Sequence, residues 1–195
     1  MSRNTMRVAL LAAGCAALAG CQTMHDTADS VGTAVSNGWN SLWGSSGNVA
    51  VAEVKPTQGN TVSGKVEFKQ SGSVVRVKVD LAGFSPGSMH GFHVHERGDC
   101  SSADGMSAGG HFNPEGVAHG SFDHPPHHAG DLPNLTADDK GQVHTSFEVT
   151  YLSVGSGGSD VAGRSVVVHR DADDFKSQPA GNSGPRLACG VIVEK

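Results

Sequence analysis

Two histidines lie two positions apart in the segment Gly91-Phe92-His93-Val94-His95. The alternation of apolar and polar residues predicts a strand, on which His93 and His95 project from one face, about 6 to 7 Å apart. That spacing lets two imidazoles share one metal ion, while Phe92 and Val94 face the core. A His-x-His pair alone is equally consistent with two outward polar residues. The prediction of a metal site therefore depends on further ligands elsewhere in the chain.

Those further ligands lie mostly in a long stretch between residues 96 and 143, which has many Gly, Pro, His and Asp residues and little strand pattern. Loops of this length in a compact domain are usually functional or disordered. A bound metal would supply the folding energy that such a loop lacks. Histidines with a carboxylate suit zinc, and an all-histidine set suits copper. The ligand-type residues are His111, His119, His128 and Asp131 in this stretch, with His169 after the apolar run at 166–168.

Short segments with period-two alternation and β-branched residues fill the chain from about residue 48 onward. Val75, Val77 and Val79 alternate with charged residues, as one buried and one wet face require. Seven such strands, separated by turn residues, predict an all-β sandwich. The predicted strands are residues 49–54, 61–68, 74–81, 91–96, 143–150, 164–170 and 187–194.

The first twenty residues have the features of an export signal. Arg3 and Arg7 precede an apolar run, residues 8–19, that is too short to span a bilayer as a helix. The run ends in Leu18-Ala19-Gly20-Cys21, which resembles the bacterial lipobox, in which the cysteine is acylated and becomes the first mature residue. A chance cysteine near an ordinary cleavage site is the alternative. We expect a lipoprotein signal peptide over residues 1–20, and acylation of Cys21 that anchors the protein without spanning the membrane.

Residues 21–47 are expected to form the lipidated N-terminus and a flexible tether, because they are rich in Gly, Ser, Thr, Asn and Ala. Trp39 and Trp43 fall on one helical face that would suit a membrane interface, with a disordered spacer as the alternative. Gln22 is not the aspartate associated with inner-membrane retention. This favours the outer membrane, with the protein facing the periplasm.

The cysteines and the net charge further restrict the class of protein and the kind of partner that we expect. Cys15 leaves with the signal and Cys21 takes the lipid, so Cys100 and Cys189 predict one disulfide in an exported domain. Closing so long a loop would contribute about 4 kcal/mol on the chain-entropy model. The formal charge of the whole chain is −5, and loss of the two signal-peptide arginines makes it more negative. Nucleic acid is therefore not an expected partner.

Five segments in order make the chain similar to the copper,zinc superoxide dismutases over residues 48–195. They are Gly91-Phe92-His93-Val94-His95-Glu96, His111-Phe112-Asn113-Pro114, His128-Ala129-Gly130-Asp131-Leu132, Val167-Val168-His169-Arg170 and Gly184-Pro185-Arg186-Leu187-Ala188-Cys189-Gly190. The resemblance implies a Greek-key β-sandwich or flattened barrel of immunoglobulin-like architecture with long metal-binding loops. It also implies dismutation of superoxide to oxygen and hydrogen peroxide, in antioxidant defence of the cell envelope.

The resemblance implies roles for individual residues. His111 would bridge the two metals, and Asp173 would be the carboxylate that braces ligands of both. Arg186 would be the cation that steers and holds the substrate anion. Copper would be bound by His93, His95, His111 and His169, and zinc by His111, His119, His128 and Asp131.

Several alternatives remain open from the sequence. A copper- or zinc-binding envelope protein on the same fold, a metal buffer or donor, is the main rival, and a structural lipoprotein is a second. The full ligand set with Arg186 favours the enzyme. Family members differ in their dimer contacts, so a homodimer is one alternative among oligomeric states. His124 and His127, like His25, His90 and His144, fall outside the ligand pattern, and the first two are expected to be surface loop residues.

Overall fold

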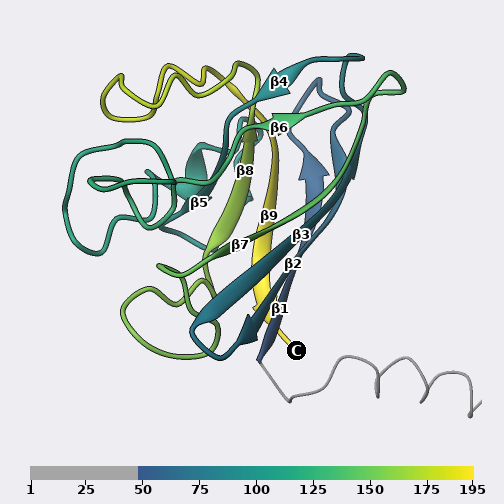
Figure 1. Cartoon of the computed structure of the whole chain (residues 1–195). Coiled ribbons are helices and arrows are strands. Elements are labelled where there is room, and N and C mark those ends of the chain that lie inside the picture. The colour runs from purple at the N-terminus through teal and green to yellow at the C-terminus, as the bar shows by residue number, and fades with distance from the viewer. Residues whose placement is uncertain (1–47) are drawn as a thin grey trace, which may run out of the picture. The chain divides into compact units, whose positions relative to one another are not determined.

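The computed structural model describes residues 48–195, which Figure 1 shows as a curled sheet with long loops on one side. A two-stranded ribbon pairs β4 (Met89–His90) with β6 (Leu135–Thr136), and the 3-10 turn η1 (Met106–Ala108) is the one helical element of residues 48–195. No helix in that range is long and apolar enough to cross a membrane. The remaining strands are β1 (Val49–Pro56), β2 (Ser63–Ser71), β3 (Val74–Ala82), β5 (Phe92–His95), β7 (Gln142–Val149), β8 (Ser165–His169) and β9 (Arg186–Glu194).

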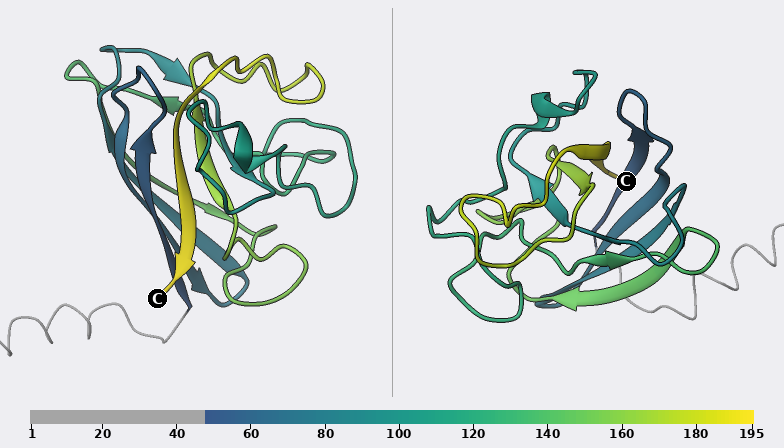
Figure 2. Two further views of the ribbon diagram at one scale, coloured as in Figure 1. Left: turned by 180° about the vertical axis from the view of Figure 1, so that it is seen from behind. Right: turned by 90° about the horizontal axis from the view of Figure 1, so that it is seen from above.

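These seven strands form one antiparallel sheet in the order β5-β8-β9-β1-β2-β3-β7. The chain passes from one end of the sheet to the other twice, between β3 and β5 and between β7 and β8. Strand β9 returns beside β1, which gives the order β9-β1-β2-β3 typical of a Greek key. The view from above in Figure 2 shows the sheet curling around its concave side. The all-β prediction is confirmed, in the form of a flattened half-barrel.

The core explains why the alternating segments become strands. On β3, Val75, Val77 and Val79 are fully buried, while Arg76 and Lys78 between them are exposed. Burying each valine stabilises the fold by about 1.5 to 3 kcal/mol, so a register slip that turned them outward would be costly. All seven predicted strands are present, with ends shifted by up to a few residues. The ribbon of β4 and β6 was not predicted, because two-residue strands have no detectable period.

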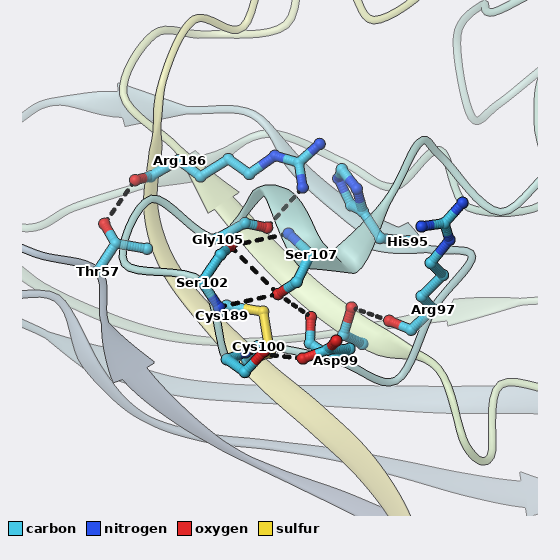
Figure 3. Close-up of a disulfide and its surroundings, with 12 residues drawn as sticks. Thr57, His95, Arg97, Asp99, Cys100, Ser102, Gly105, Ser107, Arg186 and Cys189 are labelled. Carbon is cyan, nitrogen blue, oxygen red and sulfur yellow. Dashed lines mark hydrogen bonds between the residues drawn. A yellow bond between two sulfur atoms is a disulfide. The ribbon is translucent and has the colours of Figure 1, made fainter.

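The predicted disulfide between Cys100 and Cys189 is present and ties the loop after β5 to β9 (Figure 3). Its Cα atoms lie 5.7 Å apart across a sequence separation of 89 residues. Ala108 and Val167 pack against it in a small buried cluster. The loop is therefore fixed at its base to the sheet. Cys21, Trp39 and Trp43 lie outside the described residues.

Candidate metal centre

The edge strand β5 is where the loop after it joins the sheet. One side of β5 pairs with β8, and the other would be left with unpaired backbone groups. Instead, Phe112 N–H donates to Val94 O at 2.8 Å, and Val94 N–H donates to Gly130 O at 2.9 Å. A side chain at Gly130 would collide with Val94 O, so this close approach requires glycine. The two loop segments thereby carry His111 and Asp131 to β5.

The histidines of β5 lie where the sequence pattern predicts. Phe92 and Val94 are in the main hydrophobic core, and His93 and His95 point to the opposite side. Their ring centroids are 6.3 Å apart, within the expected range. Both imidazoles are almost completely buried, so the alternative of two outward surface residues is wrong.

A first group of four buried histidines forms around this pair. Backbone carbonyls fix two of the rings: His95 Nδ1 donates to Gly109 O at 2.9 Å, and His169 Nδ1 donates to Gly184 O at 3.1 Å. Their Nε2 atoms then face each other 3.4 Å apart. His93 Nδ1 and His111 Nε2 are buried without any hydrogen-bond partner. The four ligand-type nitrogens, from His93, His95, His111 and His169, all lie within 4.8 Å of one another.

A second group surrounds one carboxylate oxygen, Asp131 Oδ1. The Nδ1 atoms of His111, His119 and His128 lie 2.8, 3.1 and 3.3 Å from it. The other oxygen, Oδ2, accepts backbone N–H groups from His128 at 2.8 Å and Gly120 at 3.2 Å. Both oxygens of the buried carboxylate are therefore in use, and the loop is wrapped around it.

His111 belongs to both groups. Its Nδ1 lies against Asp131 in the second group, which leaves Nε2 for the first. An imidazole in this position can join two cations only if both ring nitrogens are free of protons, which flanking metal charges make feasible.

Asp173 connects the two groups from behind. His93 Nε2–H donates to its Oδ2 at 2.8 Å, and His119 Nε2–H donates to its Oδ1 at 3.0 Å. Asn134 holds the backbone of Asp173 on both sides, accepting its N–H at 2.9 Å and donating to its C=O at 2.9 Å. One buried carboxylate thus sets the tautomer of one imidazole in each group.

The donor sets fit metal ions. A tetrahedral zinc site with bonds of about 2.0 to 2.1 Å has ligand atoms about 3.3 Å apart, close to the contacts around Asp131 Oδ1. His119 Nδ1 has no hydrogen-bond partner although Asp131 Oδ1 is 3.1 Å away. Cations at the two groups would satisfy these buried nitrogens, which otherwise cost free energy.

The electrostatics of the metal-free chain also favour neutral imidazoles in the first group. Burial lowers the pKa of His169 to about 3 and that of His111 to about 4, and it lowers the pKa values of His93 and His95 as well. Neutral imidazole is the form that binds metals. For Asp131, burial acts to raise the pKa, but the interactions of the carboxylate with His111, His119 and His128 outweigh it and hold the pKa well below the usual range.

Arg186 lies beside the first group because β8 and β9 pair His169 with Arg186 at a bulge. Its Nη1 donates to Gly105 O at 2.7 Å (Figure 3). Its Nη2 donates to Gly109 O, the carbonyl that also accepts the hydrogen bond from His95. Burial is the main cause of the low pKa of His95, and the Arg186 charge acts in the same direction. The guanidinium is therefore close enough to influence this group.

Other residues have smaller or unexpected parts in the site. His124 is exposed, and the ring of His127 packs against Tyr151, with 4.5 Å between centroids. Neither is in the two groups. Gln178 was not predicted: its Oε1 accepts His119 N–H at 2.9 Å and its Nε2 donates to His119 O at 2.8 Å. No local sequence signal marks it, because the two residues are 59 positions apart.

Comparison with known proteins identifies the family of this chain. Residues 62–192 match the family described as copper/zinc superoxide dismutase (SODC). The chain is 41% identical over 147 residues to copper–zinc superoxide dismutase 2 of Aquifex aeolicus (strain VF5), covering 73% of this chain and 85% of that one. The chain belongs to the copper/zinc superoxide dismutase family. The dismutase of Schizosaccharomyces pombe is 42% identical over 139 residues, which cover 67% of this chain and 89% of that one.

A solved structure shares the fold of this chain. The crystal structure of the clock protein EA4 superimposes with a TM-score of 0.68 at 35% identity, covering 77% of this chain and 96% of that one. The protein is a superoxide dismutase, with copper and zinc as cofactors and superoxide as substrate.

Proposed function

We propose that the first group binds copper and the second binds zinc, with His111 shared between them. The ligand chemistry supports this division, because copper suits four imidazoles and zinc suits three imidazoles with a carboxylate. The observation that carries the proposal is the position of His111, whose Nδ1 lies in one group while its buried Nε2 has no partner.

Bound copper supplies the one-electron chemistry of dismutation. Arg186 supplies a permanent positive charge for attracting and orienting the superoxide anion, since a guanidinium keeps its charge at any working pH. The product hydrogen peroxide needs two protons. His111 Nε2 is the ring atom that can hold a proton on the copper side, because Nδ1 is committed to the second group.

Metal content and activity, measured together on the purified protein, test this assignment. We expect one copper and one zinc per chain and rapid consumption of superoxide. Arg186→Glu should slow turnover strongly with both metals retained. Full metal content without turnover would favour the metal-buffer alternative, and unchanged kinetics of the Arg186 variant would remove that residue from substrate guidance.

We propose, separately, that the enzyme is a lipoprotein of the cell envelope, anchored through Cys21 in the outer membrane and facing the periplasm. The basic residues, the apolar run and the small residues before Cys21 support this proposal. Cys21→Ala should abolish incorporation of a labelled fatty acid and release the enzyme into the soluble periplasmic fraction. Unchanged membrane association of that variant would contradict the anchor.

A further inference from the structure

The segment between Cys100 and His111 holds the guanidinium of Arg186 through its backbone alone. The two acceptors, Gly105 O and Gly109 O, lie at the two ends of η1. Among the described residues the Arg186 side chain has no carboxylate within salt-bridge distance. The position of this cation therefore depends on how firmly residues 105–109 are held.

Two hydroxyls brace that segment from inside, as Figure 3 shows. Ser102 Oγ accepts Ser107 N–H at 2.8 Å and donates to Ser107 Oγ at 3.2 Å. Ser107 Oγ also accepts Ser102 N–H at 3.1 Å and donates its own proton to Asp99 O at 2.9 Å. We call these reciprocal bonds between Ser102 and Ser107 the serine pair. Each hydroxyl uses its single proton, so the pair forms a closed set of hydrogen bonds.

The serine pair is placed to fix both acceptors of Arg186. Gly105 N–H donates to Ser102 O at 3.0 Å, so Ser102 is the first residue of the turn that ends at Gly105. Ser107 lies inside η1, whose last bond runs from Gly109 N–H to Met106 O at 3.1 Å. The disulfide fixes the base of the segment at Cys100 and packs against Ala108, but it makes no covalent bond to any of residues 102–109. Other hydrogen bonds also anchor this segment, from Gln58 N–H to Ala103 O at 2.7 Å and from Arg97 N–H to Ala108 O at 3.1 Å. Among the hydrogen bonds of residues 48–195, those of the serine pair are the ones that join residue 102 directly to residue 107.

We propose that Ser102 and Ser107 are positioning residues for the substrate-guiding cation: their paired hydroxyls hold the Gly105 and Gly109 carbonyls at the spacing that the two guanidinium nitrogens require. This proposal rests on the proposed role of Arg186. It goes further in assigning part of the turnover rate to two half-buried serines whose hydroxyls, among residues 48–195, form no hydrogen bond with Arg186 or with a metal-ligand side chain.

A double-mutant cycle tests the proposal, with the metal-loaded, disulfide-bonded enzyme and superoxide as the probe. Ser107→Ala should lower kcat/KM by about two- to tenfold and flatten its dependence on ionic strength, with copper and zinc content unchanged. In an Arg186→Ala background the same substitution should have no further effect. Ser102→Ala should behave similarly, and Ser102→Thr, which keeps a hydroxyl, should recover most of the rate.

Controls separate this role from a general loss of structure. Ser146→Ala, an exposed position on β7, should leave kcat/KM unchanged. The proposal would be overturned if Ser107→Ala lowered kcat/KM by the same factor with and without Arg186. It would also be overturned if Ser107→Ala had no effect on kcat/KM when Arg186 is present. If Arg186→Ala itself leaves kcat/KM unchanged, the proposed role of Arg186 fails, and the positioning proposal fails with it. A loss on Arg186→Ala without one on Ser107→Ala overturns only the positioning role.

Discussion

Replacing Asp173 by asparagine tests how one buried carboxylate prepares both metal groups. The two oxygens accept N–H groups from His93 at 2.8 Å and His119 at 3.0 Å. Asparagine keeps the shape but has one acceptor oxygen, so one of these imidazoles must face an amide NH₂ that cannot accept its proton. That imidazole changes tautomer. Its N–H then occupies the nitrogen that a metal ion needs.

The expected loss follows from the number of partners removed. Losing one hydrogen-bond partner of a metal-binding imidazole lowers metal affinity by about 10- to 100-fold, or about 1.4 to 2.7 kcal/mol. Loss of the buried negative charge acts in the same direction. We therefore expect Asp173→Asn to lower the affinity for at least one of the two metals by this factor. Turnover should fall in proportion to the loss of that metal.

Chelator competition, run separately for copper and zinc, measures these affinities. Asp139→Asn is the matched control, because Asp139 is exposed and makes no side-chain hydrogen bond within residues 48–195. If Asp173→Asn binds both metals as tightly as the natural protein does, the argument that this carboxylate sets the tautomers is wrong.

Three further outcomes can be checked. Gly181→Ala should weaken metal binding more than Gly116→Ala, since both positions have φ near +60° but only a Cβ at Gly181 would collide with the carboxylate behind the metals; equal effects in chelator competition would refute this. In the metal-free protein, the free energy of unfolding should fall as pH drops from about 6.5 to 4, by about 1.4 kcal/mol per pH unit for each of His111 and His169. Their folded pKa values of about 4 and 3 mean that only the unfolded chain takes up protons in that interval, and a flat urea-denaturation profile would contradict it. Replacing both disulfide cysteines by serine should lower the free energy of unfolding by about 4 kcal/mol, measured in the same way.

The sheet could be predicted from the sequence because burial of one face requires apolar residues at every second position of a strand. The valines of β3 alternate in the sequence and in the structure alike. The ligand-type residues were also found from sequence, since histidine and aspartate are chemically distinctive and rare enough to count. The structure brings all seven of them together in two groups.

Other parts of the site could not be predicted because they involve backbone atoms or distant partners. The carbonyls of Gly105 and Gly109 hold Arg186, and a carbonyl has no residue-type signature. Asn134 supports Asp173 from 39 positions away, and an asparagine in a loop has many ordinary explanations. Such contacts arise only when the loops close over the sheet.

The way in which the loop completes β5 also bears on solubility. Residues around Phe112 and Gly130 cover the outer edge of that strand, and the same loop carries all four of the second group's ligand-type residues. If metal loss lets the loop open, a row of backbone donors and acceptors is uncovered at the end of the sheet. Exposed edges of this kind are templates for pairing with another chain. We therefore expect metal loading to protect the enzyme from aggregation as well as to equip it for catalysis.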